Sequence, residues 1–258
     1  MHPEIFGFIK SWGLLLAISF LVGAWLCVRR GRARGIHADS VLDLVFVVLV
    51  SSIIGVRLFY VITHPGEFAA GGQFDPWYRA FFVWDSGGLT LYGGIIAATL
   101  AVWWQTRRRG IPFLTMADIM APALMLGIGI TRIGCFLAGC CFGNPTTCPV
   151  GVHFPHGSLP SRTFGDVAIH PAQLYASALA FLVFGILLIW ERRPSPSGAT
   201  FFRFLLLYGA ARFVLDLTRY YETEQVWLGL SNNQWISLVM VVAGATALLL
   251  KRRETARV

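Results

Sequence analysis

The sequence is short of charge. Charged residues make up 13% of its 258 residues, whereas an ordinary soluble domain carries about 25%. Hydrophobic residues make up 56%, and the mean hydropathy is +0.64. This composition excludes a soluble globular domain and indicates a protein of the lipid bilayer. The net charge of +8 lies in short runs between apolar segments, so we expect membrane topology and no nucleic-acid partner.

Signals for removal or lipidation of the N-terminus are also missing. The first residues contain neither a basic n-region nor an A-x-A cleavage site, so we expect the first apolar segment to remain as a span. Leu26 precedes Cys27 where a lipidation site would have a small residue. The sequence contains no repeat, no low-complexity tract and no soluble domain. We therefore expect one membrane domain over residues 1–258.

Seven apolar segments run along the chain, each near the about 20 residues that a helix needs to cross a bilayer. They are residues 12–28, 41–62, 89–106, 115–137, 171–190, 200–217 and 234–250. The basic runs are Arg29, Arg30, Arg32 and Arg34; Arg107–Arg109; Arg192 and Arg193; and Lys251–Arg253.

Each basic run follows an odd-numbered segment, so all four lie on one side if every segment crosses. The positive-inside rule makes that side cytoplasmic. We therefore predict an all-α polytopic membrane protein with seven transmembrane helices, the N-terminus outside and the C-terminus cytoplasmic. Longer outer loops are expected at about residues 63–88 and 139–170.

Arg132 lies deep in the fourth segment, flanked by Gly127, Gly129, Gly134 and Gly139. A guanidinium at membrane depth costs about 2.5–3.5 kcal/mol on insertion scales, so it rarely persists without a role. The glycines leave room for a ligand or for irregular backbone. An anionic lipid headgroup is the natural partner, and a structural cap on loop carbonyls is the alternative.

The sixth segment carries a polar stripe. Tyr208, Arg212, Asp216 and Arg219 are spaced i, i+4, i+8 and i+11 and fall on one helical face. Such a stripe in a span is expected to face the interior of the bundle. The alternative is an Arg212–Asp216 pair that only neutralises itself.

Two further groups are placed near the outer side. Arg57, Tyr60 and His64 form a stripe at the outer end of the second segment, with snorkelling to headgroups as the alternative. His170 is a second candidate, or simply a residue of the N-cap region before Pro171 as a first helical residue. At about 1.5 Å per residue, the buried polar groups gather in the outer half of the bilayer. We predict a positively charged cavity there, suited to a phosphate.

Four motifs in order on this frame resemble the phosphatidylglycerol–prolipoprotein diacylglyceryl transferase family. They are residues 83–89 followed by Tyr92-Gly93-Gly94; Thr131-Arg132-Ile133-Gly134 followed by Gly139 and Gly143; His170-Pro171-Ala172-Gln173-Leu174-Tyr175; and Tyr208-Gly209 with Arg212-Phe213, Asp216 and Arg219. The likeness covers most of the chain, from Trp12 through the seventh segment.

The resemblance implies a transferase of the bacterial cytoplasmic (inner) membrane, with its active site toward the outer leaflet. The family takes a diacylglyceryl group from phosphatidylglycerol and joins it to the lipobox cysteine thiol of a prolipoprotein signal peptide, using no cofactor. By resemblance, Arg132 holds the donor headgroup, Arg212 stabilises the leaving phosphate and Tyr208 orients it. The remaining residues of the expected substrate site are Arg57, Gly134, Gly139, His170, Gln173 and Asp216.

The chain departs from the family on the side that activates the acceptor. Tyr92 stands where the family usually has the histidine proposed as base, and tyrosine is a poor base at neutral pH. Cys135 and Cys140 replace Asn and Glu, while Asp216 replaces Glu. Two other functions therefore stay open: a paralogue that modifies a different thiol or alcohol, and a non-enzymatic lipid-binding or redox protein.

The replacements gather four cysteines, Cys135, Cys140, Cys141 and Cys148, in the pattern C-x4-C-C-x6-C. On the outer face of an inner membrane disulfides are permitted. A structural disulfide, a metal site and a thiol that takes part in transfer are the three alternatives. The spacing matches no common zinc pattern, so we expect no metal.

Overall fold

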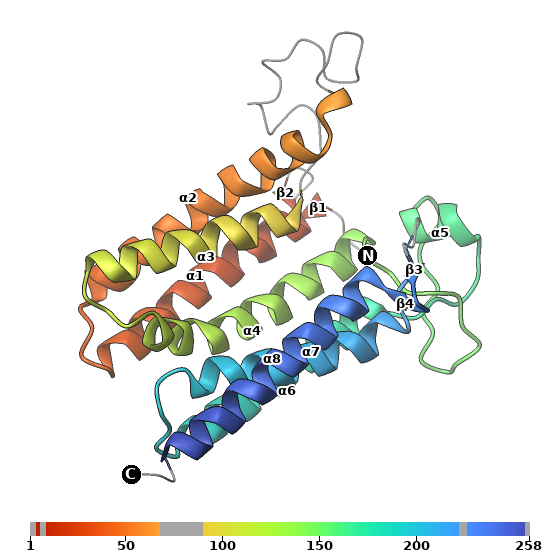
Figure 1. The fold of residues 1–258 in the computed structure, drawn as a ribbon. Helices are drawn as coiled ribbons and strands as arrows, with labels where there is room; N and C mark the ends of the chain where they lie inside the picture. The colour runs from red at the N-terminus through yellow and green to blue at the C-terminus, as the bar shows by residue number, and fades with distance from the viewer. Residues whose placement is uncertain (1–3, 6–8, 68–89, 222–225, 256–258) are drawn as a thin grey trace. The chain divides into compact units, whose positions relative to one another are not determined.

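A computed structural model describes residues 4–5, 9–67, 90–221 and 226–255. In these residues the chain is mostly helical (Figure 1). The long helices are α1 Ser11–Arg32, α2 Ala38–Thr63, α3 Leu91–Arg108, α4 Phe113–Ala138, α6 Ala172–Glu191, α7 Ala199–Asp216 and α8 Asn232–Thr255. Each of the seven predicted apolar segments coincides with one of these helices, so the all-α prediction is confirmed.

Short elements that the apolar pattern did not predict lie between the helices. They are α5 Leu159–Phe164, the 3-10 helix Pro65–Glu67, and two hairpins, β1 Glu4–Ile5 with β2 Ile9–Lys10 and β3 Val226–Trp227 with β4 Leu230–Ser231. Both hairpins are antiparallel, with Glu4 opposite Lys10 and Val226 opposite Ser231. The second turns at Leu228 and Gly229, which both have positive φ.

Five helices, α1, α2, α4, α6 and α8, are long and apolar enough to cross a bilayer. They also leave large apolar side chains exposed, for example Leu21 (67%), Phe46 (64%) and Leu182 (58%), as lipid-facing helix surfaces require. The protein is thus a polytopic α-helical membrane protein. The other two long helices are less apolar, because α3 ends in Arg107 and Arg108 and α7 contains Arg203, Arg212 and Asp216.

The described helices belong to two compact units, Met1–Cys27 with Ala117–Val258, and Val28–Met116. In the first unit α6, α7 and α8 lie side by side (Figure 1). Its core joins three helices through buried Ala121 and Met125 of α4, Val183 and Leu187 of α6, and Phe204 of α7. The core supports the helical faces that carry Arg132 and Arg212.

Glycines bring α7 and α8 into close contact. A Cβ on Gly209 would lie 2.8 Å from the Ser237 carbonyl oxygen, and one on Gly244 would lie 2.7 Å from the Phe202 carbonyl oxygen. Small residues permit this approach between membrane helices. Gly209 of the Tyr208-Gly209 motif therefore serves helix packing.

A buried carboxylate joins α4 to the start of α7. Asp118 is 5% exposed and accepts hydrogen bonds from the backbone N–H groups of Gly198 (2.7 Å) and Phe201 (2.8 Å). These N–H groups have no partner within the helix, so the carboxylate satisfies them and complements the helix dipole. Asp118 thereby ties the beginning of α7 to α4.

In the second unit α2 packs closely on α3. A Cβ on Gly55 would lie 2.5 Å from the Gly93 carbonyl oxygen, so only glycine fits at this crossing. At the far end of α3, Arg109 forms an ion pair with Asp43 of α2. The motif glycine Gly93 is again explained by helix packing.

Candidate functional site

Arg132 is positioned by the last turns of α4. The helix ends at Ala138, and Gly139 follows in the left-handed region (φ 72°), which favours glycine. Two motif glycines are filled by protein atoms: a Cβ on Gly134 would lie 3.1 Å from Trp12 of α1, and one on Gly129 would overlap Phe181 of α6. The expectation that they leave room for a ligand is therefore wrong at these two positions.

Arg132, Tyr208 and Arg212 line one cavity between α4, α6 and α7. Its other lining residues are apolar, namely Ile128, Ala176, Leu179, Ala180, Ala211 and Leu215. The cavity measures about 20 Å³, which is room for about one water molecule. The three side chains predicted to share a site thus face the same small space.

The Arg132 guanidinium has polar side chains as neighbours. It interacts with the thiols of Cys141 and Cys135 and with the Tyr208 phenol. Within the described residues this set contains no carboxylate. Both hypotheses for Arg132, a structural cap and a ligand for the lipid headgroup, stay predictions.

Arg212 is held by an acidic network. Its Nη2 donates to the Tyr221 hydroxyl at 2.7 Å and lies 3.4 Å from Asp216 Oδ1. The side chains of Arg212 and Asp216 are 14% and 1% exposed. Asp216 also accepts hydrogen bonds from Tyr221 and Ser231. Every oxygen of this carboxylate is therefore engaged by protein groups, so Asp216 positions Arg212.

The Tyr221 hydroxyl lies between the two charges. Burial, and the hydrogen bond that it donates to Asp216, raise the pKa of Tyr221 above its ordinary value. The phenol therefore stays protonated at neutral pH. It links the carboxylate to the guanidinium as a neutral donor and acceptor.

Three polar atoms of this region are buried and have no hydrogen-bond partner among the described residues. They are Arg212 Nη1, Arg219 Nε and Gln173 Oε1. Gln173 is 1% exposed, and its Nε2 donates to the Cys140 carbonyl at 2.8 Å. Buried donors without partners destabilise a fold, so two guanidinium N–H groups in one region indicate space for an acceptor.

The loop after α4 brings the motifs together. The Gly143 N–H donates to the His170 carbonyl (3.0 Å), and the Asn144 N–H donates to the Thr218 carbonyl (2.9 Å). Gly143 also forms an isolated bridge with Arg219. A Cβ on Gly143 would lie 2.5 Å from Thr218, so this junction requires glycine.

Arg219 reaches the site by that bridge and not along a helix. Because α7 ends at Asp216, the prediction that Arg219 extends the helical stripe of Tyr208 and Arg212 is wrong. Its guanidinium lies over the Tyr221 ring at 5.2 Å. The turn after α7 and the pairing with Gly143 place Arg219 near the segments that carry Arg132 and Arg212.

His170 contacts its own motif. Its Nδ1 lies 3.2 Å from the Tyr175 hydroxyl, and the two rings meet edge to face at 5.9 Å. Pro171, expected as the first helical residue, is the N-cap of α6, and no side chain caps that helix. The capping alternative for His170 is therefore not realised through its side chain.

Three of the four clustered cysteines converge. The sulfur atoms of Cys135, Cys140 and Cys141 all lie within 4.8 Å of one another. We call these three residues the thiol trio. All are free thiols, as is exposed Cys148. Cys141 has φ 60°, a conformation that is uncommon for a residue other than glycine.

The thiols of the trio differ in the direction of their pKa shifts. Hydrogen bonds from Cys135 and Cys140, and then the Arg219 and Arg132 guanidinium groups, lower the pKa of Cys141 far below that of a free thiol. Hydrogen bonds to Cys135 and Cys141 raise the pKa of Cys140. These interactions favour Cys141 as the most acidic thiol of the trio, with Cys140 as a hydrogen-bond donor to it.

The thiol trio is also the group that could hold a metal ion. A Zn–S bond of about 2.3 Å places neighbouring sulfurs about 3.8 Å apart, which is within the observed range. Structural zinc takes four ligands, and in the described part of the chain no fourth His, Cys, Asp or Glu joins the three. The site falls one ligand short of that pattern.

Arg57, Tyr60 and His64 form the expected stripe in the second unit. Tyr60 and His64 stack at 4.4 Å, and Arg57 lies 5.9 Å from the Tyr60 ring centre. Tyr60 also donates to Glu67 at 2.6 Å. Arg57 is 5% exposed, unlike a snorkelling side chain, whose charged head is exposed.

Tyr92 lies in the first turn of α3 and is 41% exposed. The backbone before it is tied to α2, because the Thr90 N–H donates to the Val56 carbonyl at 3.3 Å. The motif over residues 83–89 lies outside the described residues. The meeting of Tyr92 and Arg57 with Arg132 stays a prediction.

Sequence reasoning missed Tyr221 and Ser231, which hold Asp216. Both follow the sixth segment, and neither has helical spacing to the stripe, so no periodic signal identifies them. Asp118 was findable, because it is an acidic residue within the apolar fourth segment and such residues usually face protein.

Comparison with known proteins supplies the family. Residues 4–250 match the family described as prolipoprotein diacylglyceryl transferase. The phosphatidylglycerol–prolipoprotein diacylglyceryl transferase of Clostridium tetani is 31% identical over 243 residues, covering 93% of each chain. The enzymes of that name from Bordetella avium and Geobacter sulfurreducens are each 33% identical and cover 96% and 95% of this chain and 92% of their own lengths.

The match runs through both units and includes the segments that carry Arg132, Tyr208 and Arg212. The sequence motifs, the helical frame and the arginine-lined cavity agree with it. This chain belongs to the prolipoprotein diacylglyceryl transferase family of enzymes.

Proposed function

We propose that this protein transfers the diacylglyceryl group of phosphatidylglycerol to the lipobox cysteine of a prolipoprotein signal peptide, in the bacterial inner membrane. The names of its relatives state this reaction for those proteins. One observation carries the proposal: Arg132, Tyr208 and Arg212 face a single cavity, and Arg212 Nη1 is buried with no hydrogen-bond partner among the residues that the structure describes.

The proposed topology has all seven long helices crossing the membrane, with the N-terminus outside and the two units forming one transferase domain. The basic runs support it, since they lie in the last turns of α1, α3 and α8 and directly after the end of α6. The cavity lies at the opposite end of α7 from its start at Ala199. This arrangement would place the active site toward the outer leaflet.

The chemistry is a displacement at a glycerol carbon. The acceptor sulfur forms a C–S bond as the C–O bond to the phosphate breaks, the leaving glycerol phosphate keeps the electron pair, and the thiol proton passes to a base. Negative charge on the phosphate oxygens needs fixed cations and donors. In our proposal Arg132 holds the headgroup, Arg212 Nη1 and Tyr208 donate to the leaving phosphate, and Asp216 keeps Arg212 in place.

The cavity must widen for this reaction, because a phosphate is larger than the single water for which it has room. The lining side chains Ile128, Leu179 and Leu215 are apolar and can change rotamer more cheaply than the Asp216 network. The thiol trio, Gln173 and His170 lie on the loop side. We propose that these residues form the wall of the arginine-lined cavity on that side, while Gly134 and Gly139 set the backbone conformation at the end of α4.

The acceptor side is proposed to include Tyr92 and Arg57. The free thiol pKa of about 8.5 leaves some thiolate at neutral pH, and cations raise that fraction. Tyr92 therefore need only orient the thiol or accept its proton transiently.

A second candidate function keeps the donor and changes the acceptor to another thiol or alcohol. The thiol trio favours it, because a thiolate at Cys141 lies beside Arg132, where it could receive a lipid group. This version predicts a lipid adduct without lipidated prolipoprotein.

Complementation separates these functions. In cells depleted of their own transferase, the wild-type chain is expected to restore lipidated prolipoprotein, and Arg212→Gln is expected to fail at equal membrane expression. Arg192→Gln, which removes an exposed cation that lines neither pocket, is the matched control and is expected to restore it. Normal insertion of the wild type without any lipidation would exclude the prolipoprotein as acceptor.

A further inference from the structure

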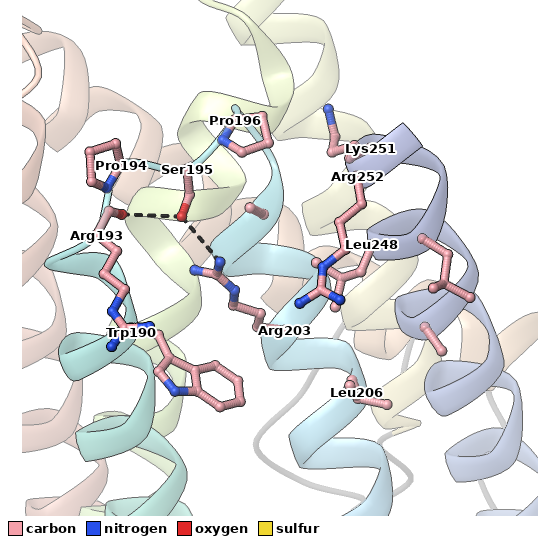
Figure 2. Close-up of a pocket in the computed structure, with 13 residues that line it drawn as sticks. Trp190, Arg193, Pro194, Ser195, Pro196, Arg203, Leu206, Leu248, Lys251 and Arg252 are labelled. Carbon is pink, nitrogen blue, oxygen red and sulfur yellow. Dashed lines mark hydrogen bonds between the residues drawn. The ribbon is translucent and has the colours of Figure 1, made fainter. Parts of the chain in front are cut away.

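A second, larger pocket lies where α6 ends, α7 begins and α8 ends (Figure 2). Its volume is about 920 Å³. It shares no lining residue with the arginine-lined cavity, and Arg203 of this pocket lies nine residues before Arg212 of that cavity, or about 14 Å along α7. It therefore forms a site of its own.

The lining of this pocket is cationic. It includes Arg193, Arg203, Lys251 and Arg252, and none of its lining residues is acidic. Figure 2 shows that these side chains come from three separate segments: the end of α6, the first turns of α7 and the end of α8. Like charges that converge on one space repel one another, and an anion in that space would relieve the repulsion.

Arg203 distinguishes this pocket from a general basic surface. It is the fifth residue of α7, near the positive end of the helix dipole, where a cation is unfavourable. Its Nη2 donates to Ser195 Oγ at 3.1 Å, and its guanidinium lies 5.8 Å from the Trp190 ring centre. Its Nη1 is buried and has no partner in the described part of the chain, so a donor is left for a ligand.

The remaining lining residues are apolar. Leu206 of α7 and Ala245, Leu248 and Leu249 of α8 line the pocket along the helices. Leu206 lies three residues after Arg203 on α7, and Leu248 lies four residues before Arg252 on α8, so both leucines are farther from the helix ends than the two arginines. A cationic rim above an apolar wall fits a phosphate joined to acyl chains better than a free anion.

We propose that this pocket binds an anionic phospholipid, with the headgroup phosphate on Arg203 and Arg252 and an acyl chain along Leu206 and Leu248. The site goes beyond the proposed transfer reaction. It would hold a lipid that stabilises the ends of three helices and is not consumed.

Native mass spectrometry of the detergent-purified protein with dioleoylphosphatidylglycerol tests the proposal. Arg203→Gln/Arg252→Gln is expected to weaken binding of one lipid about 25-fold, from about fivefold for each surface cation. Lys251→Gln/Arg252→Gln, at the end of α8, is also expected to weaken lipid binding. It tests the pocket without changing Arg203, in case the Arg203 variants do not fold. The matched control is Arg192→Gln/Arg253→Gln, which removes two exposed cations from the same helix ends outside the pocket.

Equal weakening by the control and the pocket variants would overturn the site, because it would mean diffuse surface charge. Equal binding of dioleoylphosphatidylcholine, or displacement of the lipid by 20 mM inorganic phosphate alone, would also contradict a phospholipid site. Repeating the titration with Arg132→Gln separates the two proposals. If Arg132 does not hold the donor lipid, Arg132→Gln does not lower the number of bound lipids. The pocket variants are then still expected to bind lipid more weakly than the control variant.

Discussion

The two ends of α7 handle positive charge in opposite ways. Arg212 at one end is paired with a carboxylate that is 1% exposed, and it faces a cavity of about 20 Å³. Arg203 at the other end lines an open pocket of about 920 Å³ that has no acidic lining residue. The first arrangement fixes a cation in a small, water-poor space, as transition-state stabilisation requires. The second presents cations to a ligand. One helix thus carries a reactive end and a binding end.

The largest expected effect separates these ends by activity. Arg132→Gln and Arg212→Gln are each expected to lower transferase turnover about 100- to 1,000-fold, since each removes a fixed donor to the leaving phosphate. Arg203→Gln is expected to change turnover less than about threefold. Initial rates of glycerol phosphate release measure all three. Equal losses for Arg203→Gln and Arg212→Gln would abolish the distinction between the ends.

The second effect concerns stability. Asp216→Asn leaves the Arg212 charge buried without its partner and is expected to destabilise the fold by about 3–5 kcal/mol. The matched control is Asp166→Asn, because Asp166 pairs with His153 where both side chains are more than 60% exposed and such pairs contribute little. Thermal unfolding in detergent measures both. A loss for Asp216→Asn no larger than for Asp166→Asn would mean that Arg212 does not depend on its carboxylate.

The third prediction asks whether the reactive end has a partner on α3. Tyr92→Phe is expected to lower turnover about tenfold, less than the roughly 100- to 10,000-fold that a full proton-transfer group contributes, because tyrosine is a weak base; little change is expected in the KM for phosphatidylglycerol. Tyr92→His is expected to restore or exceed wild-type turnover, because imidazole is a better base near pH 7. Tyr92→Phe at wild-type rate would exclude the hydroxyl as a required base.

The smallest effect concerns the thiol trio. Because the pKa of Cys141 is lowered, its thiolate should persist at pH 6, where a free thiol with a pKa near 8.5 is almost fully protonated. Under reducing conditions, the iodoacetamide reaction rate of Cys141 is expected to fall severalfold less than that of free cysteine between pH 9 and pH 6. Peptide mass mapping follows each cysteine. Arg219→Gln is expected to raise the pKa of Cys141 and to make its pH profile more like that of free cysteine. A wild-type Cys141 profile identical to that of free cysteine would contradict a lowered pKa.

Oxidation of the same trio provides a second test within that experiment. If the outer loop carries a structural disulfide, it is expected to join two members of the trio and to leave Cys148 free. A bond to Cys148 would require the loop to rearrange, since the sulfur of Cys148 does not belong to the converging group.

The apolar periodicity predicted the helices well, because long hydrophobic runs leave few structures other than a helix. Arg132, Tyr208 and Arg212 could be placed in one cavity from spacing and depth. Arg219, Tyr221 and Ser231 could not, because their positions depend on irregular turns and on pairing with Gly143. The roles of Gly129, Gly134 and Gly209 were also hidden, since a missing side chain serves helix packing and ligand access equally well in the sequence.

The most direct measurement is glycerol phosphate release by purified protein supplied with phosphatidylglycerol and a lipobox peptide. We expect release that requires the peptide cysteine, is accompanied by a diacylglyceryl-modified peptide, and is lost in Arg132→Gln. Release that persists in Arg132→Gln and Arg212→Gln, or a folded wild type that yields no modified peptide, would contradict it.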